Sequence, residues 1–107
     1  MSLEVRTTGD VAVVKLTDPA VDDTNVQDVG AQLFRLVEEQ GPRHLHLDFA
    51  DVKAVPSMGL GKLVALNKRV RGAGGHLALV NVPPPVYEVI QATRLDKLLD
   101  VRRKEAG

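Results

Sequence analysis

The residue types most able to carry chemistry gather near the middle of the chain, in the stretch DFADVKAVPSMGLG from Asp48 to Gly61. An alternating apolar run precedes this stretch and a run with helical spacing follows it, so it connects a predicted strand to a predicted helix. Sites in α/β proteins form at the carboxyl ends of parallel strands. The stretch holds acidic residues, one serine and two glycines, and it is therefore the strongest candidate for a functional site.

Ser57 has two interpretations, and the residues alone leave both open. Its hydroxyl could cap the following helix by accepting a hydrogen bond from a backbone N–H group. It could also be a phosphorylation site, because a phosphate would add about −1.5 to −2 charges at a helix N-terminus, where the helix dipole and free N–H groups favour an anion. Such a modification would leave the fold intact and change the surface that a partner meets.

Gly59 and Gly61 fall in the first turns of the predicted helix. Glycine inside a helix is about 1 kcal/mol less favourable than alanine. A glycine at such a position usually means that something approaches the backbone closely. A strand of the same chain would satisfy this requirement, and so would a partner protein that docks over Ser57.

Other motifs fail at named positions. A phosphate-binding loop would need glycine at Pro56 and serine or threonine at Leu63, and the dinucleotide fingerprint lacks its third glycine at Val64. His44 and His46 share one face of a predicted strand, but no further ligand is fixed beside them, so we expect no metal site. No nucleophile comes with an identifiable base. The sequence therefore predicts neither a catalytic residue nor a cofactor, and the protein is expected not to be an enzyme.

Composition narrows the class of protein further. Lys plus Arg and Asp plus Glu both total 14, so the net charge is zero, whereas nucleic-acid binders usually carry a basic excess. There is no cysteine, which excludes disulfides and thiolate sites. The chain shows neither a signal-peptide pattern nor an apolar run long enough to span a membrane. We expect a cytoplasmic protein that binds neither nucleic acid nor membrane.

Hydrophobic periodicity and turn residues predict the elements that position this stretch. Strands are expected over 3–8, 11–17, 43–49, 76–81 and 98–101, and helices over 26–40, 57–71 and 84–93. This order predicts an α/β fold with a single mixed, mostly parallel sheet of about five strands and three or more helices. The nearly all-apolar run from Val11 to Leu16 predicts a strand covered on both faces. We expect one domain over 1–107, with its core over about 3–101 and a frayed tail over 102–107.

The order and spacing of several segments resemble those of STAS domains, the sulfate-transporter and anti-sigma-factor-antagonist domains. The resemblance extends from about Val5 to Val101, and the segments that carry it are HLDFADV at 46–52, VPSMGLG at 55–61, GGHLALV at 74–80, YEVI at 87–90 and TRLD at 93–96. It implies a free-standing anti-sigma factor antagonist that controls sigma-factor-dependent transcription. Such proteins bind an anti-sigma factor serine kinase and are released when it phosphorylates a serine, and a serine phosphatase resets the switch. Ser57 matches that serine.

The resemblance also implies a partner-binding surface, made of Asp23, Asp48, Pro56, Ser57, Met58, Gly59 and Gly61. Two of these residues depart from the family pattern, since Pro56 stands where aspartate is usual and Met58 where serine or threonine is usual. These departures motivate a second hypothesis, a STAS adaptor that binds its partner without phosphorylation. A third hypothesis, from the glycines and the carboxyl end of the sheet, is a small-ligand or nucleotide-binding domain. The sequence makes no prediction of self-association.

Overall fold

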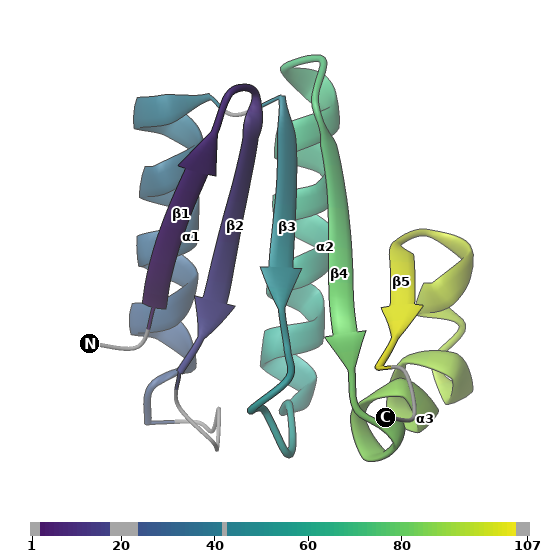
Figure 1. The fold of residues 1–107 in the computed structure, drawn as a ribbon. Helices are drawn as coiled ribbons and strands as arrows, with labels where there is room; N and C mark the ends of the chain where they lie inside the picture. Colours follow the sequence, from purple (N-terminus) through teal and green to yellow (C-terminus); the bar gives the residue numbers. More distant parts are fainter. Residues whose placement is uncertain (1–2, 18–23, 42, 105–107) are drawn as a thin grey trace.

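The computed structural model describes residues 3–17, 24–41 and 43–104, and within them five strands form one sheet in chain order (Figure 1). The strands are β1 (Leu3–Thr8), β2 (Val11–Leu16), β3 (His44–Asp48), β4 (His76–Val82) and β5 (Asp100–Arg103). The helices are α1 (Val26–Gln40), α2 (Ser57–Gly72) and α3 (Pro84–Ala92), followed by the short 3-10 helix η1 (Leu95–Lys97). The predicted mixed α/β fold is confirmed.

Strand directions follow from the connections. A tight turn at Gly9, whose φ is +59°, joins β1 to β2 as an antiparallel hairpin. Each later pair, β2–β3, β3–β4 and β4–β5, is parallel, because a helix carries the chain back between the two strands. The carboxyl ends of β2, β3 and β4 therefore lie at one edge of the sheet, together with the loop that leads into α2 (Figure 1).

Helices α1 and α2 cover the same face of the sheet (Figure 1). Along β2 the side chains alternate accordingly between buried (Ala12, Val14 and Leu16) and half-buried (Val11, Val13 and Lys15). The expectation that this strand is covered on both faces was wrong. The reason is topological, because both long helices lie on one face of the sheet. Val11 and Val13 point to the opposite face, which neither helix covers, and they are therefore only half-buried.

The core lies between the sheet and the helices, and α3 contributes to it with Val86 and Ile90. Its largest fully buried side chains include Phe49, Leu45, Leu47, Leu66, Leu77, Leu79 and Ile90. Among the described residues the buried polar side chain is that of Asn67, whose Nδ2 donates to the carbonyl oxygen of Leu98 at 3.3 Å. Two valines with the helical spacing of the buried residues are not buried themselves, since Val64 of α2 is half-buried and Val89 of α3 is exposed.

The last strand begins and ends later than the pattern predicts. It spans Asp100–Arg103, and the amide of Lys104 donates to the carbonyl of Val82 at 2.9 Å. The predicted fraying was therefore wrong for residues 102–104, because β4 offers these residues backbone partners. Residues 105–107 lie outside the described part of the chain.

Candidate functional site

The connection between β3 and α2 is a structured turn rather than an open loop. Asp48 ends β3 half-buried, and its Oδ1 accepts a hydrogen bond from the backbone N–H of Ala50 at 2.9 Å. The N–H of Val52 donates to the carbonyl of Phe49 at 2.9 Å, and both of these apolar side chains are buried. Asp48 thus has a structural task, because its carboxylate holds the turn that directs the chain toward α2.

An ion pair stands beside this turn. The Nζ of Lys15 on β2 lies 3.2 Å from Oδ2 of Asp51. The hydrogen bond that the Lys15 ammonium donates to Asp51 raises the pKa of Lys15 above its ordinary value. The pair is largely exposed, so it neutralises charge at this edge of the sheet more than it stabilises the fold.

Helix α2 begins without a side-chain cap. Pro56 is its N-cap residue, with φ −72° and ψ 163°, and no side chain caps the helix. The carbonyl of Pro56 already accepts the first helical hydrogen bond, from the N–H of Leu60 at 3.1 Å. Ser57 is the first helical residue, so the interpretation of Ser57 as the capping residue was wrong. Proline adopts the extended conformation of a cap, and the serine is moved one position into the helix.

Ser57 lies on an open surface. It is exposed, as are Met58 and Gly61, and Met58 is 48% exposed. Gly61 follows Ser57 by one helical turn and is therefore its neighbour on the same face. A Cβ atom added at Gly61 would meet nothing within 4 Å. Because residue 61 is a glycine, no side chain from the next turn of α2 covers the hydroxyl of Ser57.

The surroundings of Gly59 differ from those of Gly61. A Cβ atom on Gly59 would lie 2.8 Å from Cγ1 of Val55 and 3.5 Å from Cγ2 of Val26. The loop before α2 and the start of α1 therefore approach this helix too closely for a side chain. The predicted close approach is confirmed for Gly59, and the group that approaches belongs to the same chain. At Gly61 no such neighbour exists among the described residues.

Helix α1 contributes one direct contact to the site. Nε2 of Gln27, in the first turn of α1, donates to Sδ of Met58 at 3.4 Å. The structure thus brings together five of the predicted residues at the start of α2 and places Asp48 at the other end of the same loop. Asp23, the remaining predicted residue, lies outside the described residues.

The start of α2 favours negative charge. Its first turn contains no acidic residue, and Arg69 and Arg71 lie in its last turn. The positive end of the helix dipole is therefore not neutralised by a carboxylate within that turn, and an anion on Ser57 would be stabilised there.

A groove lies beside the site, and the sequence pattern does not predict it. It separates the loop before α2 from α3, and it is lined by Lys53, Ala54, Val55, Leu60, Pro85, Val86 and Val89. Val89 is 43% exposed. Its spacing from Val86 and Ile90 is what a buried stripe would also show, so the pattern gave no signal that this valine faces outward.

The histidines lie away from this site, on the open face of the sheet. His44 is exposed and His46 is half-buried. Partial burial, and then the charge of Arg102, lowers the pKa of His46. Within the described ranges, no three histidine or acidic side chains are grouped so that they could hold a metal ion. No helix of these ranges is long and apolar enough to cross a membrane.

Comparisons with known proteins agree with this geometry. The chain matches the family model of the STAS domain over residues 2–107. A curated protein of Paenibacillus polymyxa, named anti-sigma F factor antagonist, is 23% identical over 107 residues, covering 100% of this chain and 91% of that protein. The structure of an anti-sigma-factor antagonist (STAS) domain protein from Planctomyces limnophilus has a TM-score of 0.84 at 23% identity and covers 96% of this chain and 91% of its own. The phosphorylated form of the Bacillus cell fate determinant SpoIIAA has a TM-score of 0.70 at 17% identity, covering 92% and 89%.

Proposed function

Because the chain belongs to the STAS domain family, we propose that it is an anti-sigma factor antagonist, a binding protein whose partner is an anti-sigma factor serine kinase. The observation that carries the proposal is the position of Ser57. It is the exposed first residue of α2, and its side chain does not cap the helix. The name of the Paenibacillus relative, an anti-sigma F factor antagonist, supports the same function. We propose further that the protein acts as a single domain in the cytoplasm, without catalytic activity of its own.

Phosphorylation of Ser57 is the proposed switch. Within the described residues the Ser57 hydroxyl makes no hydrogen bond, so its oxygen can attack the γ-phosphorus of ATP in the kinase site, with its proton passing to a base of the kinase and ADP leaving. The phosphoserine would carry about −1.5 to −2 charges. The N-terminus of α2 tolerates these charges, so the fold persists while the partner surface changes. A hundredfold loss of affinity corresponds to about 2.7 kcal/mol.

Pro56 and Met58 give the partner surface its particular character. The usual acidic neighbour of the serine is replaced by an apolar ring, and the usual hydroxyl is replaced by an exposed thioether that Gln27 holds in place. Methionine side chains adapt to irregular apolar surfaces. We therefore propose that the partner presents an apolar patch to the start of α2. This contact extends to the neighbouring groove between the loop and α3, which Val89 helps to line.

The test is partner capture with tagged protein, read by mass spectrometry. Wild type, Ser57→Ala and Ser57→Asp are compared with Ala65→Asp, which adds the same charge at an exposed position of the same helix, two turns away. We expect wild type, Ser57→Ala and Ala65→Asp to capture a kinase-like ATPase and Ser57→Asp to lose it. Capture of no protein by wild type from its own lysate would count against the proposal.

A second candidate function is a STAS adaptor without phosphorylation, and the departures at Pro56 and Met58 favour it. Intact-mass analysis after incubation with the captured kinase and ATP separates the two functions. One phosphoryl group on wild type and none on Ser57→Ala supports the switch. An unmodified wild type, together with equal capture by Ser57→Asp, supports the adaptor. A serine phosphatase that resets the switch is expected only in the first case.

A further inference from the structure

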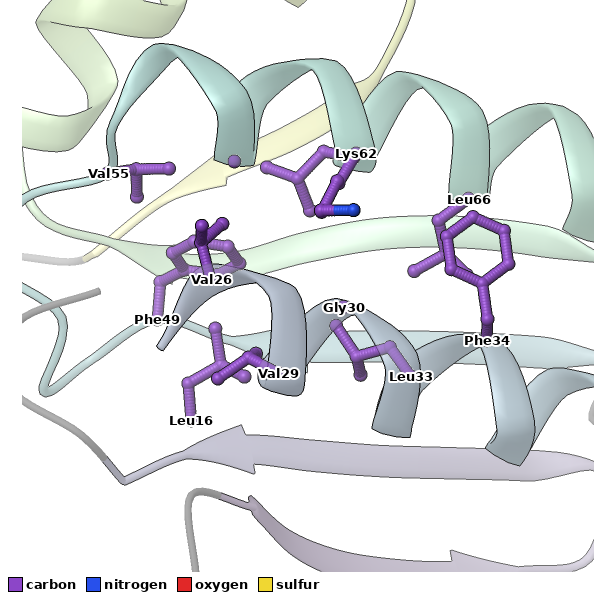
Figure 2. Close-up of a pocket in the computed structure, with 12 residues that line it drawn as sticks. Leu16, Val26, Val29, Gly30, Leu33, Phe34, Phe49, Val55, Lys62 and Leu66 are labelled. Atoms are coloured by element: carbon purple, nitrogen blue, oxygen red, sulfur yellow. The ribbon is translucent and has the colours of Figure 1, made fainter. Parts of the chain in front are cut away.

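Strand β1 forms an open edge of the sheet. It has a single neighbour in the sheet, β2, and five of its six residues are exposed, including Val5 at 44%. Helix α1 leaves this strand uncovered because it packs further inward. In Figure 2 the side chains of α1 lie against Leu16 of β2 and against Phe49, which follows β3, and no residue of β1 lines this interface.

The backbone of β1 presents a regular row of hydrogen-bonding groups at this edge. The carbonyl of Asp10 accepts a hydrogen bond from the N–H of His44 at 3.0 Å, so Asp10 faces β3. Successive residues of a strand face opposite neighbours, and Val11 therefore faces β1, where it pairs with Thr8. By the same alternation, every second residue of β1 directs its N–H and carbonyl groups away from β2. These residues are Leu3, Val5 and Thr7.

Nothing in β1 protects this edge from another strand. Natural edge strands are usually kept from pairing by proline, by a bulge or by their shortness. The opposite edge, β5, has only four residues and shifts its register against β4. Strand β1 has six residues, contains no proline and pairs with β2 without a shift in register. It is therefore the edge that can accept an added strand.

The charges of β1 match those of a second copy of the same strand. Two identical edges related by a two-fold axis pair antiparallel, because only then do the donors of one strand meet the acceptors of the other. If the axis passes through Val5, Glu4 lies opposite Arg6 of the second copy, on the face that the long helices do not cover. An axis through Glu4 or through Arg6 would bring like charges together. Both residues are exposed and make no ion pair within the described part of the chain.

We propose that two copies of this chain pair through β1 in this register and join their sheets into one. The contact combines the backbone hydrogen bonds of the open edge, a contact between the two Val5 side chains and two symmetric ion pairs between Glu4 and Arg6. One edge strand buries a small area, so we expect association in the micromolar range rather than an obligate dimer. Ser57 lies outside β1, and the proposal does not depend on its proposed function.

The experiment is sedimentation equilibrium of the full chain over a range of concentrations, combined with amide hydrogen exchange measured by NMR. The variants are Glu4→Arg, Arg6→Glu and the protein with both changes. Glu88→Arg is the matched control, because it makes the same change of charge at an exposed position of α3. A further variant, Val5→Pro, removes an N–H that points away from β2 and leaves the bonds between β1 and β2 in place. Far-ultraviolet circular dichroism verifies that each variant is folded.

We expect wild type and Glu88→Arg to dimerise with the same affinity, and Val5→Pro to remain monomeric. Glu4→Arg and Arg6→Glu should each weaken dimerisation about tenfold or more, because like charges then face each other at two symmetric places. The protein with both changes should recover the affinity of wild type to within about threefold, since the ion pairs are restored with their signs exchanged. As the dimer forms, exchange should slow at the outward-facing amides of Leu3, Val5 and Thr7.

Four results would each overturn the proposal. The first is a wild type that stays monomeric up to about 1 mM. The second is a dimer whose outward-facing amides still exchange freely, which would place the contact on another surface. The third is a double charge exchange that binds no better than either single variant. The fourth is a monomer whose outward-facing amides are protected only when the partner captured through Ser57 is added, which would assign this edge to that partner.

Discussion

Replacing the two glycines of α2 by alanine should change stability in opposite directions, although only one residue separates them. At Gly61 the new methyl group meets nothing within 4 Å. The change then brings only the gain in helix propensity, up to about 1 kcal/mol. The free energy of unfolding of Gly61→Ala should therefore rise by about 0.5–1 kcal/mol.

At Gly59 the same gain is outweighed by packing. The new Cβ atom would lie 2.8 Å from Cγ1 of Val55, which is too close for two carbon atoms. A valine side chain has little freedom to turn away, because branching at Cβ restricts χ1. Overpacking of this kind costs about 1–3 kcal/mol. After subtraction of the propensity gain of about 1 kcal/mol, Gly59→Ala should lose up to about 2 kcal/mol.

Urea denaturation followed by far-ultraviolet circular dichroism measures both changes, with the slope of the transition as the control for two-state unfolding. Two results would refute the reasoning: a Gly59→Ala protein at least as stable as wild type, or a Gly61→Ala protein that is less stable than wild type. Capture of the partner gives a second readout. Because Gly61 leaves the surface beside Ser57 uncovered, Gly61→Ala should weaken capture even though it stabilises the fold.

Three further predictions concern single side chains. Ser57→Ala should change the free energy of unfolding by less than about 0.5 kcal/mol in urea denaturation, because no cap is lost, whereas a true N-cap serine would cost about 1 kcal/mol. Leu63→Ala should cost about 2–5 kcal/mol in the same assay, because Leu63 is buried in the core; a loss below this range would mean that the neighbouring side chains close the cavity left by the substitution. The hydrogen bond from Arg102, and then the one from His76, holds the pKa of the Asp100 carboxyl below its ordinary value. Its stabilising effect is therefore complete above that ordinary value and is lost as the pH falls through the lower, folded-state pKa. Asp100→Asn should be less stable than wild type by under about 1 kcal/mol at neutral pH. The difference should begin to shrink only below the ordinary pKa of aspartate, about 3.9, and should vanish once the pH is below the lower, folded-state pKa.

Much of this protein follows from its sequence. The order of strands and helices is set by local patterns, namely alternation in β1 and β3, helical spacing in α1 and α2, and breaks at Gly41 and at residues 72–75. Each of these patterns involves residues that are close together in the sequence, so the helices and strands can be predicted without knowing how the rest of the chain folds. The same local patterns place Ser57 at the start of a helix that follows a parallel strand, which is enough to identify the candidate site.

Other features depend on residues far apart in the sequence, and only the tertiary structure decides them. The sequence of β2 is as apolar as that of a strand covered on both faces. Both long helices nevertheless pack on one face of the sheet, so only alternate residues of β2 are buried. Gly59 and Gly61 look alike in the chain, yet only Gly59 has Val55 and Val26 against it. Gly30 and Lys62 meet only because α1 and α2 pack against each other, and the lysine stem lies where a side chain at residue 30 would be. Packing between separate elements has no local pattern, because it is determined by which side chains the fold brings within van der Waals distance.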